Sequence, residues 1–495
     1  MKYIVLLIAV LLPLAEQQSW SLQSLVENKL MTFIQEQKDQ VEKLVNGYDD
    51  ARTYLEDQHK KITDDIYKYI DNVKDSGRQI TEPWSIDEDE AKLENPDEFL
   101  TAPGIISRHG YVCETHTVVS KGYVINFHRI PRSKRGGVVP TKTVLLQHGL
   151  FASSVDWILN GPGKGLAYVL ADAGYDVWMS NVRGNRYSRE HTSLNSNSKA
   201  YWNFSWHDVA KHDIPAVIDY ILDFKGTNTK ITYIGHSMGT TILFAMLTLR
   251  PEYNDKLTAG FALAPVVYLS DIQSPIKTLA PVASSAASMD MLSNTHEFVP
   301  KNSALGKITS TCSLDAADLS VCKNIAFYIC GYNEKQFNSS LLPVFLSHLG
   351  SGTSWKTVVH FAQEINAGGK FQQFDYGSKN FEIYGSVYPP EYDLSKITLP
   401  ISLFWSKNDL LSSEHDVKKL YHALESKKEM YLIPDPEFNH LDYLWAINAP
   451  RLLNNKVLEY LERAFNAEER HKSFNPYEVH SGYNFNHIRF VSLRM

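Results

Sequence analysis

Residues 231–249 read Ile-Thr-Tyr-Ile-Gly-His-Ser-Met-Gly-Thr-Thr-Ile-Leu-Phe-Ala-Met-Leu-Thr-Leu, and this stretch decides the fold. Its first four residues predict a buried strand, and the apolar run from Thr240 to Leu249 predicts a helix. Between them stands a G-x-S-x-G pattern, in which Ser237 would occupy a strained turn from strand to helix. The flanking Gly235 and Gly239 are needed because neighbouring backbone passes close to them. A strand before the pattern and a helix after it favour this interpretation over a plain structural turn.

Six further runs of β-forming residues flank this stretch and alternate with helical patterns. We expect strands at residues 123–130, 143–147, 176–180, 260–264, 401–405 and 430–433, beside the one at 231–234. The clearest helical pattern follows a capping box at residues 205–208 and places on one face Ile214, Val217, Ile218, Ile221 and Leu222. Apolar strands that alternate with helices predict an α/β fold, with a mostly parallel central sheet and helices on both faces.

The alternation lapses at residues 271–396, which are rich in Ser, Ala, Pro and Gly. A long insertion between core strands is typical of a cap, or lid, over an active site. We therefore expect the core in two parts, at residues 93–270 and 397–466. An aromatic, His-containing tail follows at residues 467–495.

The N-terminal region reads differently from the core. Residues 1–15 contain one cation and a short apolar run, which predicts a signal peptide, since a membrane span needs roughly 20 apolar residues. Export agrees with two glycosylation sequons, at Asn203 and Asn338. Residues 16–92 repeat apolar positions at helical spacing and predict an amphipathic helical extension. Its helices would pack on the main domain or on each other, or would serve a lipid-surface or regulatory role. No later segment has the length and freedom from charge of a transmembrane helix, so we expect a soluble product.

The composition of the 495 residues is that of an ordinary globular protein, with 43% hydrophobic residues and a net charge of −7. This charge gives no reason to expect nucleic-acid binding. No cluster of Cys, His or Asp has the spacing of metal ligands, and we expect neither a metal site nor a cofactor. Cys312 and Cys322 lie close enough in sequence to close one loop, and Cys113 and Cys330 would then be free buried thiols.

A serine hydroxyl becomes a nucleophile when a histidine removes its proton and a carboxylate orients that histidine. In a fold with this strand-turn-helix pattern the chain order is serine, acid, histidine, each in a loop after a core strand. Asp409 follows the expected strand at 401–405, and His440 follows the one at 430–433. Asp416 and His415 are rivals in a helix-like stretch, and Asp442 is a third rival that lies too close to His440 in sequence to be independent of it. The order and the strand ends favour Ser237, Asp409 and His440 as the catalytic residues.

The tetrahedral intermediate formed at this serine also needs hydrogen-bond donors for its oxyanion. One donor should be the backbone N–H of Met238, directly after the nucleophile. The other should follow an early strand, where His148-Gly149-Leu150 points to the N–H of Leu150. A plain strand-ending turn is the alternative interpretation of His148-Gly149.

Several stretches between about residues 93 and 466 resemble the acid lipase family, the group of gastric and lysosomal acid lipases and their invertebrate relatives. The stretches that carry the resemblance are residues 110–131, 146–150, 176–178, 181–185, 235–239, 352–355, 408–411 and 438–443. Together they are far more specific than the serine motif alone.

The resemblance implies an α/β-hydrolase fold with a lid-bearing cap, and hydrolysis of triacylglycerols or of sterol and other long-chain esters, often in an acidic compartment. It implies a triad of Ser237, Asp409 and His440. It also implies oxyanion donors at Leu150 and Met238, a disulfide between Cys312 and Cys322, and an unpaired Cys330.

The chain departs from the family pattern at two positions. Met238 stands where vertebrate members have glutamine, and catalysis should survive because that position acts through its backbone N–H. Lys121 replaces an acidic residue at a turn that lies far from the triad in sequence. The extension to residue 92 and the tail from residue 467 have no counterpart in the resemblance.

The favoured hypothesis is a lipase, secreted or lysosomal, that acts on lipid esters at a lipid–water interface. A carboxylesterase or thioesterase for soluble esters is the second hypothesis, because fold and triad do not select the substrate. A lipid carrier without catalysis is the third, and it would be expected to lack a triad member. The sequence does not indicate an oligomeric state.

Overall fold

The computed structural model describes residues 95–226, 229–284, 297–298 and 326–473. The expected signal peptide, the N-terminal extension, and both Cys312 and Cys322 lie outside the described residues. Most of the tail, residues 474–495, lies outside them as well.

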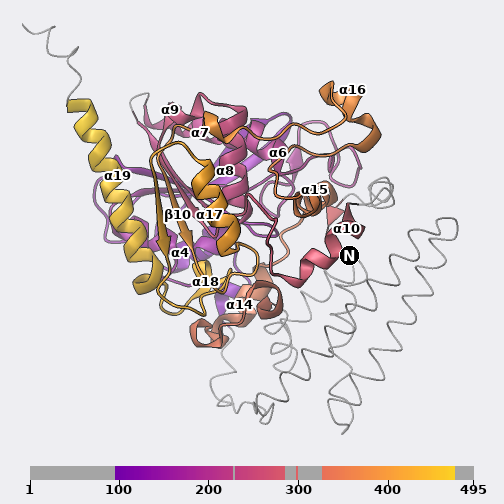
Figure 1. The fold of residues 1–495 in the computed structure, drawn as a ribbon. Coiled ribbons are helices and arrows are strands. Elements are labelled where there is room, and N and C mark those ends of the chain that lie inside the picture. The colour runs from indigo at the N-terminus through magenta and orange to yellow at the C-terminus, as the bar shows by residue number, and fades with distance from the viewer. Residues whose placement is uncertain (1–94, 227–228, 285–296, 299–325, 474–495) are drawn as a thin grey trace, which may run out of the picture.

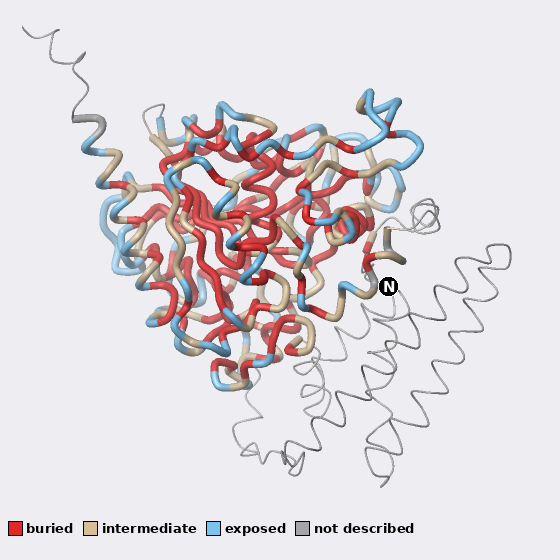
Figure 2. The backbone as a smooth tube through the Cα atoms, viewed as in Figure 1, coloured by how far each residue is buried: buried red, intermediate tan, exposed pale blue. Residues whose placement is uncertain are grey.

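A central sheet forms the core of the described chain (Figures 1 and 2). Its strands follow the order β1-β2-β4-β3-β6-β7-β10-β11, and β5 pairs with β2. From β4 to β11 all neighbours are parallel, while β1 and β2 pair antiparallel at one side. The strands are β1 (Glu114–Ser120), β2 (Tyr123–Ile130), β3 (Thr143–Gln147), β4 (Asp176–Met179), β5 (Glu190–His191), β6 (Ile231–His236), β7 (Leu257–Leu263), β10 (Ile401–Trp405) and β11 (Lys428–Leu432). The mostly parallel sheet predicted from the sequence is confirmed.

Helices cover both faces of the sheet. Successive side chains of β3 point to opposite faces, so that Val144 and Leu146 pack with α5 and α19 while Leu145 packs with α7, α8 and α17. These helices are α5 (Leu166–Asp172), α7 (Ile214–Lys225), α8 (Met238–Leu249), α17 (Glu414–Ala423) and α19 (Asn455–Ser473). Further helices are α4 (Ala102–Arg108), α6 (Trp206–Asp208), α9 (Tyr253–Lys256) and α18 (Asp442–Trp445). Every residue of β3 and β6 is buried, as expected for parallel strands in a sheet that is covered on both faces.

The capping box predicted at residues 205–208 is present at the start of α6. The backbone N–H of Ser205 donates to the carboxylate of Asp208 at 2.8 Å, and the Ser205 hydroxyl accepts from the backbone of His207 at 3.2 Å. Helix α6 continues through a π-helical turn, Val209–Asp213, into the predicted amphipathic helix α7.

A two-residue turn joins β1 to β2, and β1 was not predicted from the sequence. Lys121 and Gly122 both have positive φ, 50° and 88° respectively, as a tight hairpin of this kind requires. Residues of β1 alternate between exposed and half-buried, so the strand lacks the apolar run that marks its neighbours. Lys121, one of the two departures from the family pattern, therefore lies in this turn.

Between β7 and β10 the described residues add no strand to the central sheet. They form helices α10 (Ala280–Ala283), α14 (Leu342–His348), α15 (Trp355–Asn366) and α16 (Asn380–Tyr384), and a separate strand pair, β8 (Glu297–Phe298) with β9 (Thr353–Ser354). A cap at residues 271–396 stays a prediction. Among the described residues, no helix has both the length and the apolar character needed to span a bilayer.

Candidate active site

Ser237 occupies a sharp turn between β6 and α8. Its φ of 54° and ψ of −120° are unusual for a residue other than glycine, which marks backbone strain at this position. The glycines around it have no room for a side chain: a Cβ on Gly239 would lie 2.2 Å from the carbonyl oxygen of Gln147, and one on Gly235 would lie 2.6 Å from the backbone of Gly239. The need for glycine at both positions thus follows from close backbone packing, of Gly239 against the end of β3 and of Gly235 against the start of α8.

Three side chains from three loops form a hydrogen-bond chain at the carboxyl edge of the sheet. The Oγ of Ser237 lies 2.8 Å from Nε2 of His440, and Nδ1 of His440 lies 2.8 Å from Oδ2 of Asp409. Asp409 follows β10, and His440 follows β11. When Nδ1–H donates to the carboxylate, Nε2 is left to accept the serine proton, which is the arrangement needed for general-base catalysis.

Backbone amides hold the carboxylate of Asp409 in place. Its Oδ1 accepts hydrogen bonds from the N–H groups of Leu411 at 2.9 Å and Ser412 at 2.8 Å. Both Asp409 and His440 are only 3% exposed, so water competes little with these contacts. The carboxylate is thereby oriented before any substrate binds.

His236 stabilises the loop of His440 through a hydrogen bond to its backbone. Its Nε2–H donates to the backbone carbonyl of His440 at 2.9 Å. Burial holds the pKa of His236 well below its usual value, with a further contribution from nearby His440. His236 therefore stays neutral and acts as a hydrogen-bond donor to the loop.

The two backbone groups expected to bind an oxyanion belong to segments next to the serine. Met238 is the first residue of α8, so its N–H has no partner within the helix. The loop that carries Leu150 lies against the nucleophile, since a Cβ on Gly149 would be 3.1 Å from Cβ of Ser237.

His148 fixes this second loop. Its Nδ1–H donates to the carbonyl of Gly149 at 2.8 Å, and its Nε2 accepts from the backbone N–H of Val182 at 3.2 Å. Burial lowers the pKa of His148 to about 4, so the imidazole keeps the neutral tautomer that both contacts need.

Comparison with known proteins places the chain in a family. A family profile described as the alpha/beta hydrolase fold matches residues 142–312, and one described as a partial alpha/beta-hydrolase lipase region matches residues 102–161. Lipase 1 of Drosophila melanogaster is 37% identical over 369 residues, which cover 74% of this chain and 80% of that protein. Gastric triacylglycerol lipase of Rattus norvegicus is 36% identical over 74% of this chain and 93% of its own length. This chain belongs to the acid lipase family.

Another acid lipase, the lysosomal acid lipase/cholesteryl ester hydrolase of Macaca fascicularis, is 34% identical over 74% of this chain and 92% of its own length. A solved structure of a soluble variant of monoglyceride lipase from Saccharomyces cerevisiae aligns with 71% of the chain at 13% identity and a TM-score of 0.46. As a member of this family the chain is a serine carboxylic-ester hydrolase.

In this acid lipase a segment from the long insertion binds the loops of Asp409 and His440 together. We call residues 330–333 the strap. The carbonyl of Cys330 accepts from the N–H of His440 at 3.2 Å and, more weakly, from that of Leu410 at 3.5 Å. Gly331 has a φ of 111°, and a Cβ there would lie 2.0 Å from the carbonyl oxygen of Asn408, so the strap packs directly on the Asp409 loop.

Side-chain amides complete the contacts of the strap. Nδ2 of Asn408 donates to the carbonyl of Tyr332 and Nδ2 of Asn439 donates to that of Gly331, each at 2.8 Å. Sequence reasoning missed these residues, although each asparagine stands directly before a member of the proposed triad.

Asp442 links the strap to the loop of His440. Its Oδ2 accepts from Nδ2 of Asn333 at 2.7 Å and from the backbone N–H of Asn439 at 2.8 Å. Burial raises the pKa of Asp442 to about 7. Asp442 thus steadies the His440 loop through Asn439 and makes no contact with the imidazole.

The remaining candidate residues lie away from the triad. Asp416 is buried on α17, where it accepts from Ser270 and Asp271, and His415 beside it is exposed, so the structure brings neither rival to Ser237. Asn203 is exposed and Asn338 is half-buried, and their glycosylation stays a prediction. The residues described contain no group of His, Cys, Asp or Glu arranged to hold a metal ion.

The two described cysteines are free thiols. Cys330 is buried, as expected, whereas Cys113 is only half-buried. Burial raises the pKa of Cys113 to about 12 and that of Cys330 further, so both stay protonated at neutral pH. The expected disulfide between Cys312 and Cys322 lies outside the described residues and stays a prediction.

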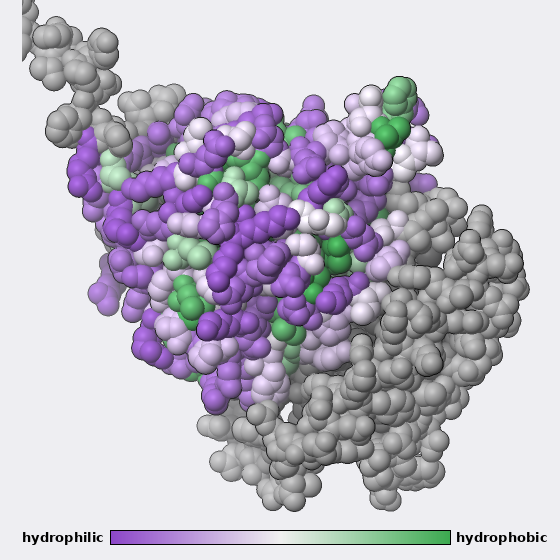
Figure 3. Space-filling view, in the orientation of Figure 1, coloured by the Kyte–Doolittle hydropathy of each residue, from purple (hydrophilic) through white to green (hydrophobic). Residues whose placement is uncertain are grey.

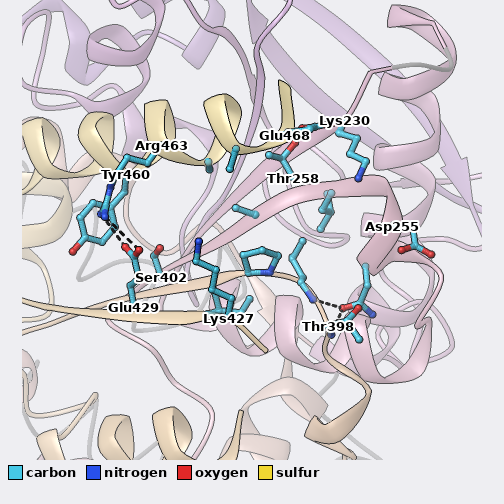
Figure 4. Close-up of a pocket in the computed structure, with 18 residues that line it drawn as sticks. Lys230, Asp255, Thr258, Thr398, Ser402, Lys427, Glu429, Tyr460, Arg463 and Glu468 are labelled. Atoms are coloured by element: carbon cyan, nitrogen blue, oxygen red, sulfur yellow. Dashed lines mark hydrogen bonds and ion pairs between the residues drawn. The ribbon is translucent and has the colours of Figure 1, made fainter. Parts of the chain in front are cut away.

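A cavity of about 370 Å³ lies at the opposite, amino edge of the sheet (Figure 4). It is bounded by the beginnings of β7 and β10 and by α19, and Thr258, Ser402 and Arg463 are among its lining residues. None of the triad residues borders it. The cavity is therefore not part of the candidate active site.

Proposed function

We propose that this protein is a lipase that hydrolyses carboxylic ester bonds of neutral lipids, namely triacylglycerols and sterol esters, with Ser237, His440 and Asp409 as its triad. The observation that carries the proposal is the hydrogen-bond chain from Ser237 through His440 to Asp409, with both contacts at 2.8 Å. The names of the gastric and lysosomal relatives support the lipid substrate. They also support a secreted or lysosomal location, which the expected signal peptide favours.

The reaction begins when Oγ of Ser237 attacks the ester carbonyl carbon and Nε2 of His440 takes the hydroxyl proton. The carbonyl oxygen becomes an oxyanion, and the N–H groups of Leu150 and Met238 stabilise it. Collapse of the intermediate breaks the bond to the alcohol, which leaves with the proton from His440. Water then attacks the acyl-enzyme while His440 takes its proton; the bond to Oγ breaks, the fatty acid is released, and His440 returns the proton to Ser237. Asp409 stabilises the imidazolium throughout.

The test is release of fatty acid from emulsified long-chain triacylglycerol between about pH 4 and pH 8, a range that spans the ordinary pKa of histidine. Turnover of a soluble short-chain ester is measured beside it. We expect the native protein to cleave the emulsion and the Ser237→Ala variant to lose activity on both substrates. Ser274→Ala is the matched control, because Ser274 is buried and its hydroxyl has no hydrogen-bond partner among the described residues.

Three results would contradict the proposal, each in a different way. Cleavage of the soluble ester alone would favour a carboxylesterase or thioesterase. Binding of lipid without cleavage of either substrate would favour a carrier. Equal activity of the native and Ser237→Ala proteins would place the chemistry elsewhere in the chain.

A further inference from the structure

A loop of the insertion carries a cluster of apolar side chains on its outside. We call residues 376–389 the tip loop; it contains helix α16. Four of its large apolar side chains are unusually exposed: Phe381 (68%), Ile383 (47%), Val387 (65%) and Tyr388 (73%). The tip loop projects from the body of the molecule beyond α15, and its end is hydrophobic at the surface (Figures 1 and 3). The other large exposed apolar side chains of the described chain are spread over distant elements.

Polar groups hold the tip loop from within. Asn380 is buried at its base, where Oδ1 accepts from the N–H of Tyr376 at 2.8 Å. Nδ2 of Asn380 donates to Oδ1 of Asp375 at 2.7 Å and to the carbonyl of Val387 at 3.0 Å. The tip loop thus differs from an ordinary surface loop, because the side-chain amide of Asn380 is buried while four apolar side chains are exposed.

The base of the tip loop is also tied to its neighbours. The backbone of Asp375 exchanges two hydrogen bonds with the side chain of Gln363 on α15, at 2.8 and 2.9 Å. The hydroxyl of Tyr384 donates to the carbonyl of Phe374 at 2.8 Å. Helix α16 ends at Gly385, which has the left-handed conformation that stops a helix. Since these bonds order the backbone, the apolar side chains are presented in a fixed arrangement.

We propose that Phe381, Ile383, Val387 and Tyr388 dock the protein on a lipid–water interface. The inference rests on the proposed function, because a lipase must reach esters that do not dissolve in water. A cluster of exposed apolar side chains is unfavourable in water unless another apolar phase covers it. The backbone order of the tip loop reduces the entropy lost when it docks.

The shape and charge of the tip loop favour lipid over a protein partner. A stable protein interface buries about 800 Å² on each partner and uses 20–30 residues, whereas this cluster has four large side chains on a convex projection. Lipid can surround such a projection on all sides. The only charged residues in the tip loop are Lys379 and Glu382, and their opposite charges cancel. The tip loop therefore suits a lipid surface that is neutral or zwitterionic. Aromatic side chains such as Tyr388 suit the boundary between lipid and water.

The test compares two fourfold variants of the full chain. In the tip variant, Phe381, Ile383, Val387 and Tyr388 are all changed to serine. In the matched control, four exposed apolar residues on other elements, Phe99, Val112, Val119 and Val138, are changed to serine. Binding to phosphatidylcholine vesicles is measured by sedimentation in the Ser237→Ala background, so that no lipid is consumed. Turnover of a soluble short-chain ester is measured with Ser237 intact.

We expect the tip variant to need at least about tenfold more vesicle lipid for half-maximal binding, because the four apolar side chains that would be buried in the lipid are replaced by serine. The control should bind as the parent does, and both variants should keep their turnover of the soluble ester. Equal binding by the parent and the tip variant, or no binding by the parent, would overturn the proposal. Self-association of the parent that the tip variant lacks, without a change in vesicle binding, would show that the cluster joins two copies of the chain. Because vesicle binding does not require ester cleavage, failure of this proposal and failure of the proposed function are separate results.

Discussion

At the carboxyl edge of the sheet a Cβ on Gly239 would meet the backbone carbonyl of Gln147 at 2.2 Å, whereas a Cβ on Gly260, the middle residue of β7, would meet Cδ1 of Ile401 at the amino edge at 2.7 Å. The first obstacle is backbone in the centre of the sheet. The second is the end of a side chain that lines the cavity of about 370 Å³. The same substitution therefore meets a fixed neighbour at one edge and a movable one at the other.

This difference shows where the fold is held most rigidly. At the carboxyl edge, backbone contacts position Ser237, and amide hydrogen bonds position Asp409. A preorganised site needs such support, because reacting groups displaced by about 1 Å lose much of their effect. At the amino edge β7 and β10 begin beside the cavity, and we expect side chains there to adjust to a substitution more easily. Four predictions test this contrast, and they run from the largest expected effect to the smallest.

The largest effect is expected for Asp409→Asn. The amide cannot stabilise the imidazolium of His440 and favours the wrong tautomer, so kcat on a soluble ester should fall by about 10⁴-fold. Circular dichroism should show that the fold is kept. Asp416→Asn is the control, because Asp416 is a buried aspartate of the same region that contacts Ser270 and Asp271. A larger loss of kcat in Asp416→Asn would show that the acid is misassigned.

The second prediction pairs the two glycines. Gly239→Ala should destabilise the protein by more than about 4 kcal/mol, because the backbone of β3 cannot move away. Gly260→Ala should cost about 1–2 kcal/mol, since Ile401 and its neighbours can shift toward the cavity. Urea unfolding of both variants measures the contrast. Similar costs at the two positions would mean that the edges are equally rigid.

The third prediction concerns Asp442, whose pKa is raised by burial to about 7 from the usual 3.8. Between these values the folded state holds a proton that the unfolded state has lost. The stabilisation is therefore full below about pH 4 and is lost as the pH rises toward about 7, by up to about 4 kcal/mol. In Asp442→Asn this loss should disappear.

Urea unfolding of the native and Asp442→Asn proteins between about pH 4 and pH 8 checks the sign. Asp223→Asn, a change at an exposed carboxylate of α7, serves as the control. Parallel profiles for the native and Asp442→Asn proteins would show that the network of Asn333 and Asn439 does not depend on a protonated Asp442.

The smallest effect is expected for Ser402→Val at the amino edge. Ser402 is half-buried on β10 and lines the cavity (Figure 4). Valine suits a strand and has room, so the free energy of unfolding should stay within about 0.5 kcal/mol and kcat should not change. A tenfold fall in kcat would show that the amino edge is coupled to the active site.

The sequence predicted the core and the candidate triad because both depend on local patterns. Apolar runs marked the strands, and the expected strand at residues 260–264 differs from β7 mainly at its start. The ends of β10 and β11 could be located in the same way. These positions were enough to predict that Asp409 and His440, which follow the two strands, lie near each other. Strand β1 was missed because its residues alternate in burial and include several polar ones.

Contacts between residues far apart in the chain leave no local pattern in the sequence. Asn333 and Asp442 bond across 109 positions of the chain, and nothing near either residue indicates its partner. The tip loop was missed for a different reason. Phe381 and Ile383 look like ordinary core residues in the sequence, and only the folded chain shows that they face outward.

The strap also limits how this enzyme can be recombined with its relatives. Cap exchange treats an insertion as a module that can be cut out at its two junctions. Here the carbonyls of Cys330 and Gly331, within the insertion, bind the loop of His440, and Tyr332 binds that of Asp409. A chimaera that replaces residues 271–396 as a block would exchange part of the scaffold around the proposed triad together with the rest of the insertion. A junction that keeps residues 330–333 native would preserve that scaffold and still allow the preceding part of the insertion to be varied.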